Sequence, residues 1–468
     1  MRLVSSALLL AAAVACLANP SSATAQLSAE QQQKIAAATG KVLQQSGVPS
    51  ASVGIVENGK IVYTHAFGLA RVQPPLPADA NMAYPVGSIS KQFTASAVLL
   101  LQQQGKLSVD DSVAKYFPEL TEADKVTIRN LLTHTSGYQD YAPQDYTIPA
   151  WRLPGDPLKV LHEFAGKPLD FQPGTQWQYS NTNFVLAALI VQKVSGEPFA
   201  KYLRENILEP AHLPDVLNLN TERDQLKVTG YMRNALAPIR PAALEAPGWY
   251  FGDADLAMPI ASLLKWDLTF INQSLLTPAS YKQMETSFVL KGGKDSHYGF
   301  GVDVRTLNGH REIEHSGEVG GFVAENAVFP DDHAAIAILT NQEASGAASQ
   351  IAKALIPLVL EVSSAAAPDA FAPHLKAILT GLQQGNIDRA EFTPDTNSYF
   401  DQDALDDYKS SLAPLGSIES VTKVRSALRG GMSFGLYRVA FSGGTALLVT
   451  VYLEPDGKIE QLLVEGKE

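Results

Sequence analysis

The sequence predicts an α+β protein in which segments far apart in the chain complete one antiparallel sheet beside a helical lobe, followed by a small second α+β domain. The first observation is a hairpin signal, since Asn58-Gly59 lies between the apolar runs 51–56 and 61–63. The second is that strand patterns return only at 312–315, 323–329 and 334–339, after a helix-rich middle. Strands at both ends of a helical middle predict a single sheet with helices packed on it.

The elements follow in order along the chain. A polar helix is expected from Ser28 to about Gln45, ahead of the hairpin. A second helix is expected from Lys91 to Gln104, where Gly105 ends it, and it opens a helix-rich region that runs to about Asn272.

The end of the chain reads as a separate module. A small-residue segment with proline, residues 363–370, predicts a linker between a catalytic domain (26–362) and an accessory domain (371–468). Helix patterns at 375–382 and 403–412 precede four strand-like runs, and this order is similar to that of NTF2-like domains. Few contacts are expected to cross the linker, and no residue set in the module suggests chemistry.

The N-terminus predicts export. Arg2 precedes an apolar run from Leu8 to Leu17 and an Ala23-Thr24-Ala25 site, so residues 1–25 are expected to be a signal peptide cut after Ala25. The protein would then be periplasmic or secreted. An alternative makes the single cysteine, Cys16, the lipid-bearing residue of a lipoprotein. No later stretch is long enough for an integral membrane span.

Composition excludes some partners and leaves others open. With 36 basic and 48 acidic residues the net charge is −12, which argues against a nucleic-acid partner. The histidines show no metal-ligand spacing, so neither metal nor cofactor is expected. The expected partner is a small-molecule or peptide substrate, and the sequence leaves the oligomeric state open.

The chemistry is expected at Ser88 and Lys91. Residues at i and i+3 share one helical face, so the lysine can reach the serine hydroxyl. A serine is a weak nucleophile unless a neighbouring base takes its proton. By itself Ser-x-x-Lys is common, and Ser88 could merely cap its helix.

A series of further motifs gives this pair its context. The segment 83–94 resembles the active-site segment of class C β-lactamases and DD-peptidases, the penicillin-recognising serine hydrolases. The resemblance continues in the expected order at Leu131-Leu132-Thr133-His134-Thr135-Ser136-Gly137, Phe171-Gln172-Pro173-Gly174, Tyr179-Ser180-Asn181, Tyr298-Gly299-Phe300-Gly301 and His315-Ser316-Gly317-Glu318.

The resemblance implies a β-lactamase/DD-peptidase fold and a role for each matching residue. Ser88 would attack a carbonyl, and Lys91 and Tyr179 would share the role of general base, with the choice between them open. Asn181 would hold substrate or Lys91. His315, Ser316 and Gly317 would contact substrate, and the backbone N–H groups of Ser88 and Glu318 would form the oxyanion hole.

The third motif departs from the β-lactamase pattern, because His315 stands where lysine is usual. A neutral imidazole offers no permanent charge to a substrate carboxylate. The histidine form is similar to esterases and D-aminopeptidases, so the expected function is an acyl-enzyme serine hydrolase acting on an ester, small amide or peptide. As pH falls, His315 is expected to gain a proton and favour carboxylate-bearing substrates.

Two alternatives stay open: a DD-carboxypeptidase or β-lactamase acting on peptidoglycan or β-lactams, and a non-catalytic protein that binds cell-wall fragments. Two decoys are set aside. Gly431-Met432-Ser433-Phe434-Gly435 matches a nucleophile elbow but has strand patterns on both sides, so it is predicted to be a hairpin. His134 is expected to pack within its turn.

Overall fold

The computed structural model describes residues 27–467 except 308, 361–368, 370 and 430–431. The predicted signal peptide with Cys16 and Ala25, and nearly all of the predicted linker, lie outside the described residues. The signal peptide and the linker therefore stay predictions.

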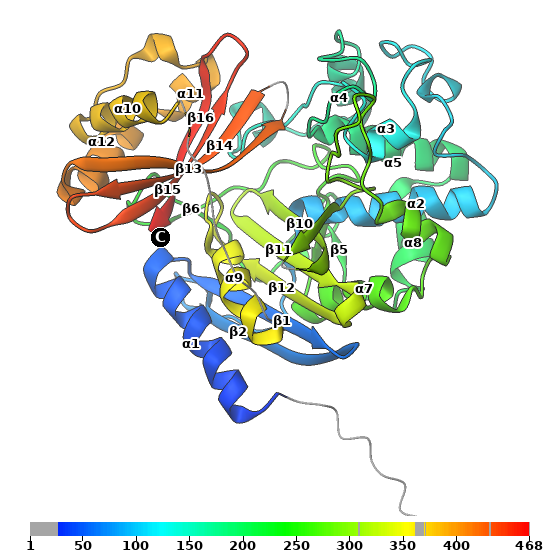
Figure 1. Ribbon diagram of the computed structural model, residues 1–468, viewed down its shortest axis with the longest axis horizontal. Coiled ribbons are helices and arrows are strands. Elements are labelled where there is room, and N and C mark those ends of the chain that lie inside the picture. The colour runs from blue at the N-terminus through cyan, green and yellow to red at the C-terminus, as the bar shows by residue number, and fades with distance from the viewer. Residues whose placement is uncertain (1–26, 308, 361–368, 370, 430–431, 468) are drawn as a thin grey trace, which may run out of the picture.

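The main sheet joins the beginning of the catalytic domain to its end (Figure 1). Its seven strands lie in the order β3-β2-β1-β12-β11-β10-β9, with antiparallel neighbours throughout. Ala51 pairs with Thr340, so the first hairpin is completed by a strand almost 290 residues later. The strands are β1 (Ser50–Glu57), β2 (Lys60–Arg71), β3 (Leu76–Pro77), β9 (Asp303–Leu307), β10 (His310–Val319), β11 (Phe322–Phe329) and β12 (Ala334–Thr340). The predicted antiparallel sheet is confirmed, and β9 is an additional edge strand.

Helices cover both faces of this sheet. α1 (Ala29–Ser46) and α9 (Ala347–Val359) pack on one face, where Val53 and Ile55 of β1 point. α7 (Ile260–Asn272) packs on the other face so closely that a Cβ on Gly54 would lie 2.7 Å from a Leu264 methyl. The alternation of a strand's side chains therefore buries β1 on both faces.

The helical lobe is built around α2 (Ser90–Gln103) and α5 (Asn181–Ser195), which are buried almost throughout. The predicted helix at 91–104 is thus confirmed within one residue. Around them lie α3 (Ile128–Leu132), α4 (Pro157–Phe164), α6 (Phe199–Leu203) and α8 (Pro278–Met284). The short strands of the catalytic domain are β4 (Tyr84–Pro85), β5 (Leu217–Asn218), β6 (Tyr231–Met232), β7 (Arg240–Pro241) and β8 (Leu256–Met258).

The C-terminal domain packs three helices on one face of a four-stranded sheet. Its elements are α10 (Ala372–Gln384), α11 (Pro394–Tyr399), α12 (Gln402–Leu412), β13 (Ile418–Arg429), β14 (Met432–Phe441), β15 (Ala446–Leu453) and β16 (Ile459–Lys467). Ser433 lies on β14, which pairs antiparallel with β13, so the decoy motif is part of a hairpin as predicted. Similarity to NTF2-like domains stays a prediction.

The expectation of few contacts between the domains is wrong. Ala235 of the catalytic domain belongs to the hydrophobic core of the C-terminal domain. Arg240 forms an ion pair of 2.7 Å with Asp407, and the rings of Tyr146 and Tyr399 lie 5.4 Å apart. A small-residue linker marks the boundary in the sequence, but it carries no information on how the two surfaces pack.

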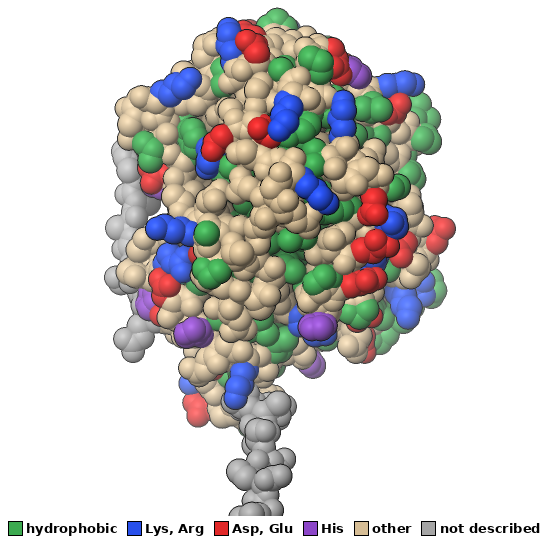
Figure 2. Space-filling model, turned by 90° about the vertical axis from the view of Figure 1, so that its right-hand side faces the viewer, with side chains coloured by type: hydrophobic (Ala, Val, Ile, Leu, Met, Phe, Trp, Pro, Cys, Tyr) green, Lys and Arg blue, Asp and Glu red, His purple; other side chains and the backbone are tan. Residues whose placement is uncertain are grey.

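The surface charges and the helix lengths relate to the predicted absence of a nucleic-acid partner and of a membrane span. On the face of the helical lobe drawn in Figure 2, Lys and Arg side chains are interspersed with Asp and Glu. Among the helices that the structure describes, none is long and apolar enough to cross a membrane.

Candidate active site

Ser88 lies at the entrance to α2. It occupies a short 3₁₀ turn, Gly87–Ile89, that leads directly into the helix at Ser90. Its half-buried side chain therefore projects at the helix N-terminus, where unpaired N–H groups and the helix dipole favour a developing negative charge. The Ser88 side chain does not cap the helix, which was the alternative to a catalytic role, but is hydrogen-bonded to Lys91.

Lys91 is fully buried and points at Ser88. Its Nζ lies 2.9 Å from Ser88 Oγ, 2.7 Å from Asn181 Oδ1 and 3.1 Å from the carbonyl oxygen of Asp253. The two latter oxygens can only accept hydrogen bonds, so they fix two N–H groups of the amine. The remaining position faces Ser88 Oγ, where an ammonium donates and a neutral amine can accept the serine proton.

Asn181 holds Lys91 and is itself held. Its Nδ2 donates to the carbonyl oxygen of Ala142 at 3.0 Å and to Asp140 Oδ2 at 3.3 Å, which leaves Oδ1 facing Lys91. Of the two roles expected for Asn181, the geometry places it in contact with the lysine.

Tyr179 lies beside the same lysine, whose Nζ is 4.9 Å from the centre of the tyrosine ring. His134 packs against Tyr179 with ring centres 4.2 Å apart, and its Nδ1 accepts a hydrogen bond of 3.3 Å from the Ser180 backbone N–H. His134 therefore packs within its turn and supports Tyr179.

His315 is buried on β10 with both ring nitrogens engaged. Nδ1 lies 2.5 Å from the Ser316 carbonyl oxygen, which can only accept, so this nitrogen carries the proton. Nε2 lies 2.8 Å from the Tyr298 hydroxyl and accepts from it when the ring is neutral. Burial, with a contribution from the nearby Lys91 charge, lowers the pKa of His315 to about 4. The imidazole is therefore neutral at pH 5.5 to 8.5, so the expected gain of a proton falls below that range.

The backbone of β10 approaches the nucleophile very closely. A Cβ on Gly317 would lie 1.9 Å from the Val86 carbonyl oxygen and 3.0 Å from Ser88 N, and a Cβ on Gly87 would lie 2.5 Å from Glu318 N. Only glycine fits at these two positions. The contact brings the backbone segments that carry the N–H groups of Ser88 and Glu318 close together, which is compatible with the predicted oxyanion hole.

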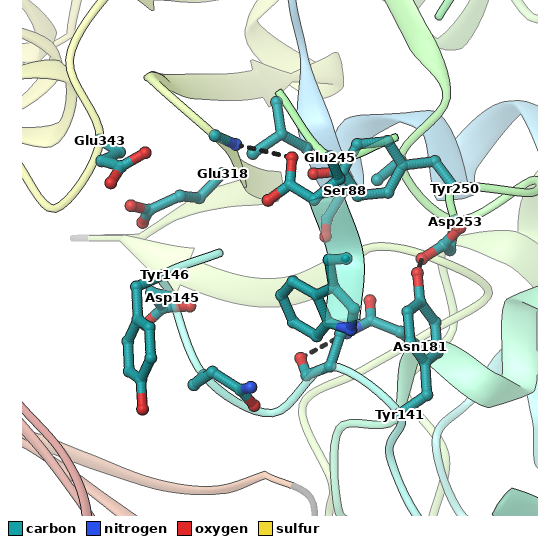
Figure 3. Close-up of a pocket in the computed structure, with 16 residues that line it drawn as sticks. Ser88, Tyr141, Asp145, Tyr146, Asn181, Glu245, Tyr250, Asp253, Glu318 and Glu343 are labelled. Carbon is teal, nitrogen blue, oxygen red and sulfur yellow. Dashed lines mark hydrogen bonds between the residues drawn. The ribbon is translucent and has the colours of Figure 1, made fainter. Parts of the chain in front are cut away.

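A first cavity of about 50 Å³ opens beside Ser88 (Figure 3). Residues of the helical lobe, including Tyr141 and Asn181, line one side. Carboxyl groups are prominent in the rest of the lining: Asp145, Glu245, Asp253, Glu318 and Glu343.

A second cavity of about 220 Å³ also reaches Ser88. It shares Ser88, Asp145 and Glu318 with the first, so the two form one cleft around the nucleophile. Tyr179, His315, Ser316 and Gly317 line it, which means that the structure brings all of the predicted catalytic and binding residues except the buried Lys91 and Asn181 into this one cavity. The remaining lining comes partly from the C-terminal domain.

Sequence reasoning missed several groups at this site. Tyr298 was noted only as part of a motif, yet its hydroxyl orients His315. Asp253 supplies a carbonyl oxygen to Lys91, and its carboxylate accepts a hydrogen bond of 2.6 Å from the Tyr141 hydroxyl. No spacing in the sequence could have indicated Asp253, because it lies 162 residues from Lys91 and acts through its backbone.

Known proteins resemble this chain in sequence. A family model described as Beta-lactamase matches residues 30–361. Penicillin-binding protein 4* of Bacillus subtilis (strain 168) is 29% identical over 312 residues, covering 63% of this chain and 68% of its own length. A D-aminopeptidase of Brucella anthropi is 26% identical over 324 residues, covering 68% of this chain and 60% of that protein. The chain thus spans about three fifths to two thirds of the length of these curated relatives.

A solved structure is similar over most of the chain. The octameric penicillin-binding protein homologue from Pyrococcus abyssi superimposes with a TM-score of 0.63 at 22% identity, covering 93% of this chain and 99% of that one. At this identity the likeness speaks to the fold alone, and its extent requires it to include much of the C-terminal domain. The family match over residues 30–361, together with the fold, shows that the chain belongs to the Beta-lactamase family.

Proposed function

We propose that the protein is an exported serine hydrolase that acts through an acyl-enzyme on an ester or on a small amide or peptide. The observation that carries this proposal is the hydrogen bond of 2.9 Å between Lys91 Nζ and Ser88 Oγ. The backbone N–H groups expected to stabilise an oxyanion belong to Ser88 and to Glu318, which lines the same cleft. The signal-peptide pattern at residues 1–25 supports export.

In acylation, Ser88 Oγ attacks the substrate carbonyl carbon while its proton passes to the Lys91–Tyr179 pair. The carbonyl oxygen becomes an oxyanion, stabilised by the N–H groups of Ser88 and Glu318. The bond to the leaving oxygen or nitrogen then breaks, and the proton held by the pair goes to that atom. Water next attacks the acyl carbon of the Ser88 ester while one of its protons passes to the same pair. The bond from that carbon to Oγ then breaks, and the pair returns the proton to Oγ, which releases the acid and restores the serine.

The third motif favours esters and amides over β-lactams. A neutral His315, locked between Tyr298 and the Ser316 carbonyl, supplies no positive charge for a substrate carboxylate. The D-aminopeptidase relative supports an amide or peptide substrate. A DD-carboxypeptidase or β-lactamase acting here would find no permanent positive charge at this position for the carboxylate of its substrate.

The test compares two serines in the full chain. Ser88→Ala should abolish labelling by a fluorophosphonate probe and lower kcat for p-nitrophenyl acetate by several orders of magnitude, on the order of 10⁶. Ser433→Ala, which removes the serine of the decoy motif on β14, should leave both near wild type. Equal losses in both variants, or labelling that survives Ser88→Ala, contradict the assignment. Absence of labelling in the wild type would favour the non-catalytic binding protein.

A further inference from the structure

The C-terminal sheet has one face turned toward the nucleophile. Along β15, Val449 and Val451 point into the core beneath the helices α10 and α12. Because strand side chains alternate, Thr450 and Tyr452 point to the opposite face. That face contributes Phe434, Thr450, Tyr452 and Glu465 to the second cavity, in which Ser88, Tyr179 and His315 also lie.

Direct hydrogen bonds fix this face against the catalytic domain. Asp145, in the loop that follows α3, donates its backbone N–H to Gln461 Oε1 at 2.6 Å. Its carboxylate accepts hydrogen bonds of 3.2 Å from both Gln461 Nε2 and the Tyr452 hydroxyl. Gln461 is fully buried, whereas Asp145 is partly exposed. Asp145 itself lines both cavities, so the same residue takes part in the domain contact and in the substrate cleft.

The wall combines aromatic rings with carboxyl groups. The rings of Phe434 and Tyr452 lie 5.1 Å apart across neighbouring strands, and Glu465 lines the same cavity. Glu318 and Asp303 add carboxyl groups from the catalytic side. Among the described residues that line the two cavities, none is lysine or arginine. Lys91, whose Nζ is hydrogen-bonded to Ser88 Oγ, is fully buried and does not line either cavity.

The carboxyl groups are crowded enough to affect one another. Burial first, and then the neighbouring Asp145, Glu465 and Glu343, raise the pKa of Glu318 well above its usual range. Burial, with Glu245 and Asp145 nearby, raises the pKa of Glu343 to about 8. These raised pKa values favour the neutral forms of both carboxyl groups; a positive charge entering the cleft would favour their ionised forms, whereas a negative charge would oppose ionisation further.

We propose that the C-terminal domain forms one wall of the active site and that Phe434, Tyr452 and Glu465 select small esters and amides that carry a positively charged amino group. The ammonium would lie near the Glu465 carboxylate and the faces of the two rings, which attract cations. The inference rests on the proposed hydrolase function and adds a substrate class to it.

The test uses three achiral substrates with one leaving group and different charge. Glycine p-nitroanilide is cationic at pH 7, its N-acetyl derivative is neutral and its N-succinyl derivative is anionic. The full-length wild type should show kcat/KM at least tenfold higher for the cationic than for the neutral substrate, and lowest for the anionic one. Glu465→Gln should reduce the cationic-to-neutral ratio about fivefold or more, Phe434→Leu should reduce it less, and Glu465→Asp should retain most of it.

The matched control is Glu419→Gln, which removes an exposed carboxyl group on β13 of the same domain that lines neither cavity. It should leave both the rates and the ratio unchanged. An equal reduction in Glu465→Gln and Glu419→Gln, or a wild type without preference for the cationic substrate, overturns the inference. If p-nitrophenyl acetate is still hydrolysed and Ser88 still labelled in that case, the hydrolase function stands. If neither occurs in the wild type, the hydrolase function fails, and the inference fails with it.

Discussion

Gly317→Ala tests whether the close approach of β10 to Ser88 builds the oxyanion hole. The added Cβ would lie 1.9 Å from the Val86 carbonyl oxygen, so the two segments must separate by about 1.5 Å to reach ordinary contact at 3.4 Å. The φ of Gly317 is not in the left-handed region, so the alanine is excluded by contact and not by its own backbone. The N–H of Glu318, the next residue, moves with it.

Loss of one oxyanion donor in such sites costs about 2.7–4 kcal/mol of transition-state stabilisation, which is roughly a 10²–10³-fold loss in kcat. We expect this loss for p-nitrophenyl acetate, with little change in KM because ground-state binding depends less on the oxyanion donors. The assay is steady-state hydrolysis at pH 7, accompanied by circular dichroism and thermal melting.

The control is Gly40→Ala, in the middle of α1, where an added Cβ meets no atom within 4 Å. That change should leave kcat unaltered and stabilise the protein by roughly 0.5–1 kcal/mol, because alanine is the better helix former. A folded Gly317→Ala protein with kcat within threefold of wild type would refute the reasoning.

Two further predictions concern His315. Its folded pKa of about 4 lies below the usual 6.5, so the unfolded chain binds more protons between these values and His315 makes stability fall as pH drops through that window. From this shift, urea titrations at pH 7 and pH 4 should show a stability loss about 3 kcal/mol larger in wild type than in His315→Gln; equal losses would mean that His315 is not buried as a neutral ring. His315→Lys supplies a cation beside the cleft and should raise the kcat/KM ratio of nitrocefin to p-nitrophenyl acetate about tenfold, in line with about 1.4 kcal/mol for a charge-assisted hydrogen bond. An unchanged ratio would show that His315 does not set the substrate class.

The amino-acid sequence was enough to predict the contact between Ser88 and Lys91 and the main outline of the catalytic domain. Ser88 and Lys91 are one helical turn apart, so local helix geometry was enough to predict their contact, and the structure has it at 2.9 Å. The Asn58-Gly59 hairpin and the three late strands were also readable, because turn residues and alternating side chains are local signals.

Only the tertiary structure decided what surrounds the serine. The carbonyl oxygen of Asp253, the Tyr298 hydroxyl and the Asp145–Gln461 bonds join segments 17 to 316 residues apart, and such pairings follow from packing and not from local pattern. The same holds for the C-terminal domain. Its strands could be predicted from alternating runs in the sequence. Which face of its sheet contacts helices and which lines the cleft depends on how the two domains pack together. Alternation tells that a strand has two different faces, and the tertiary contacts decide what each face touches.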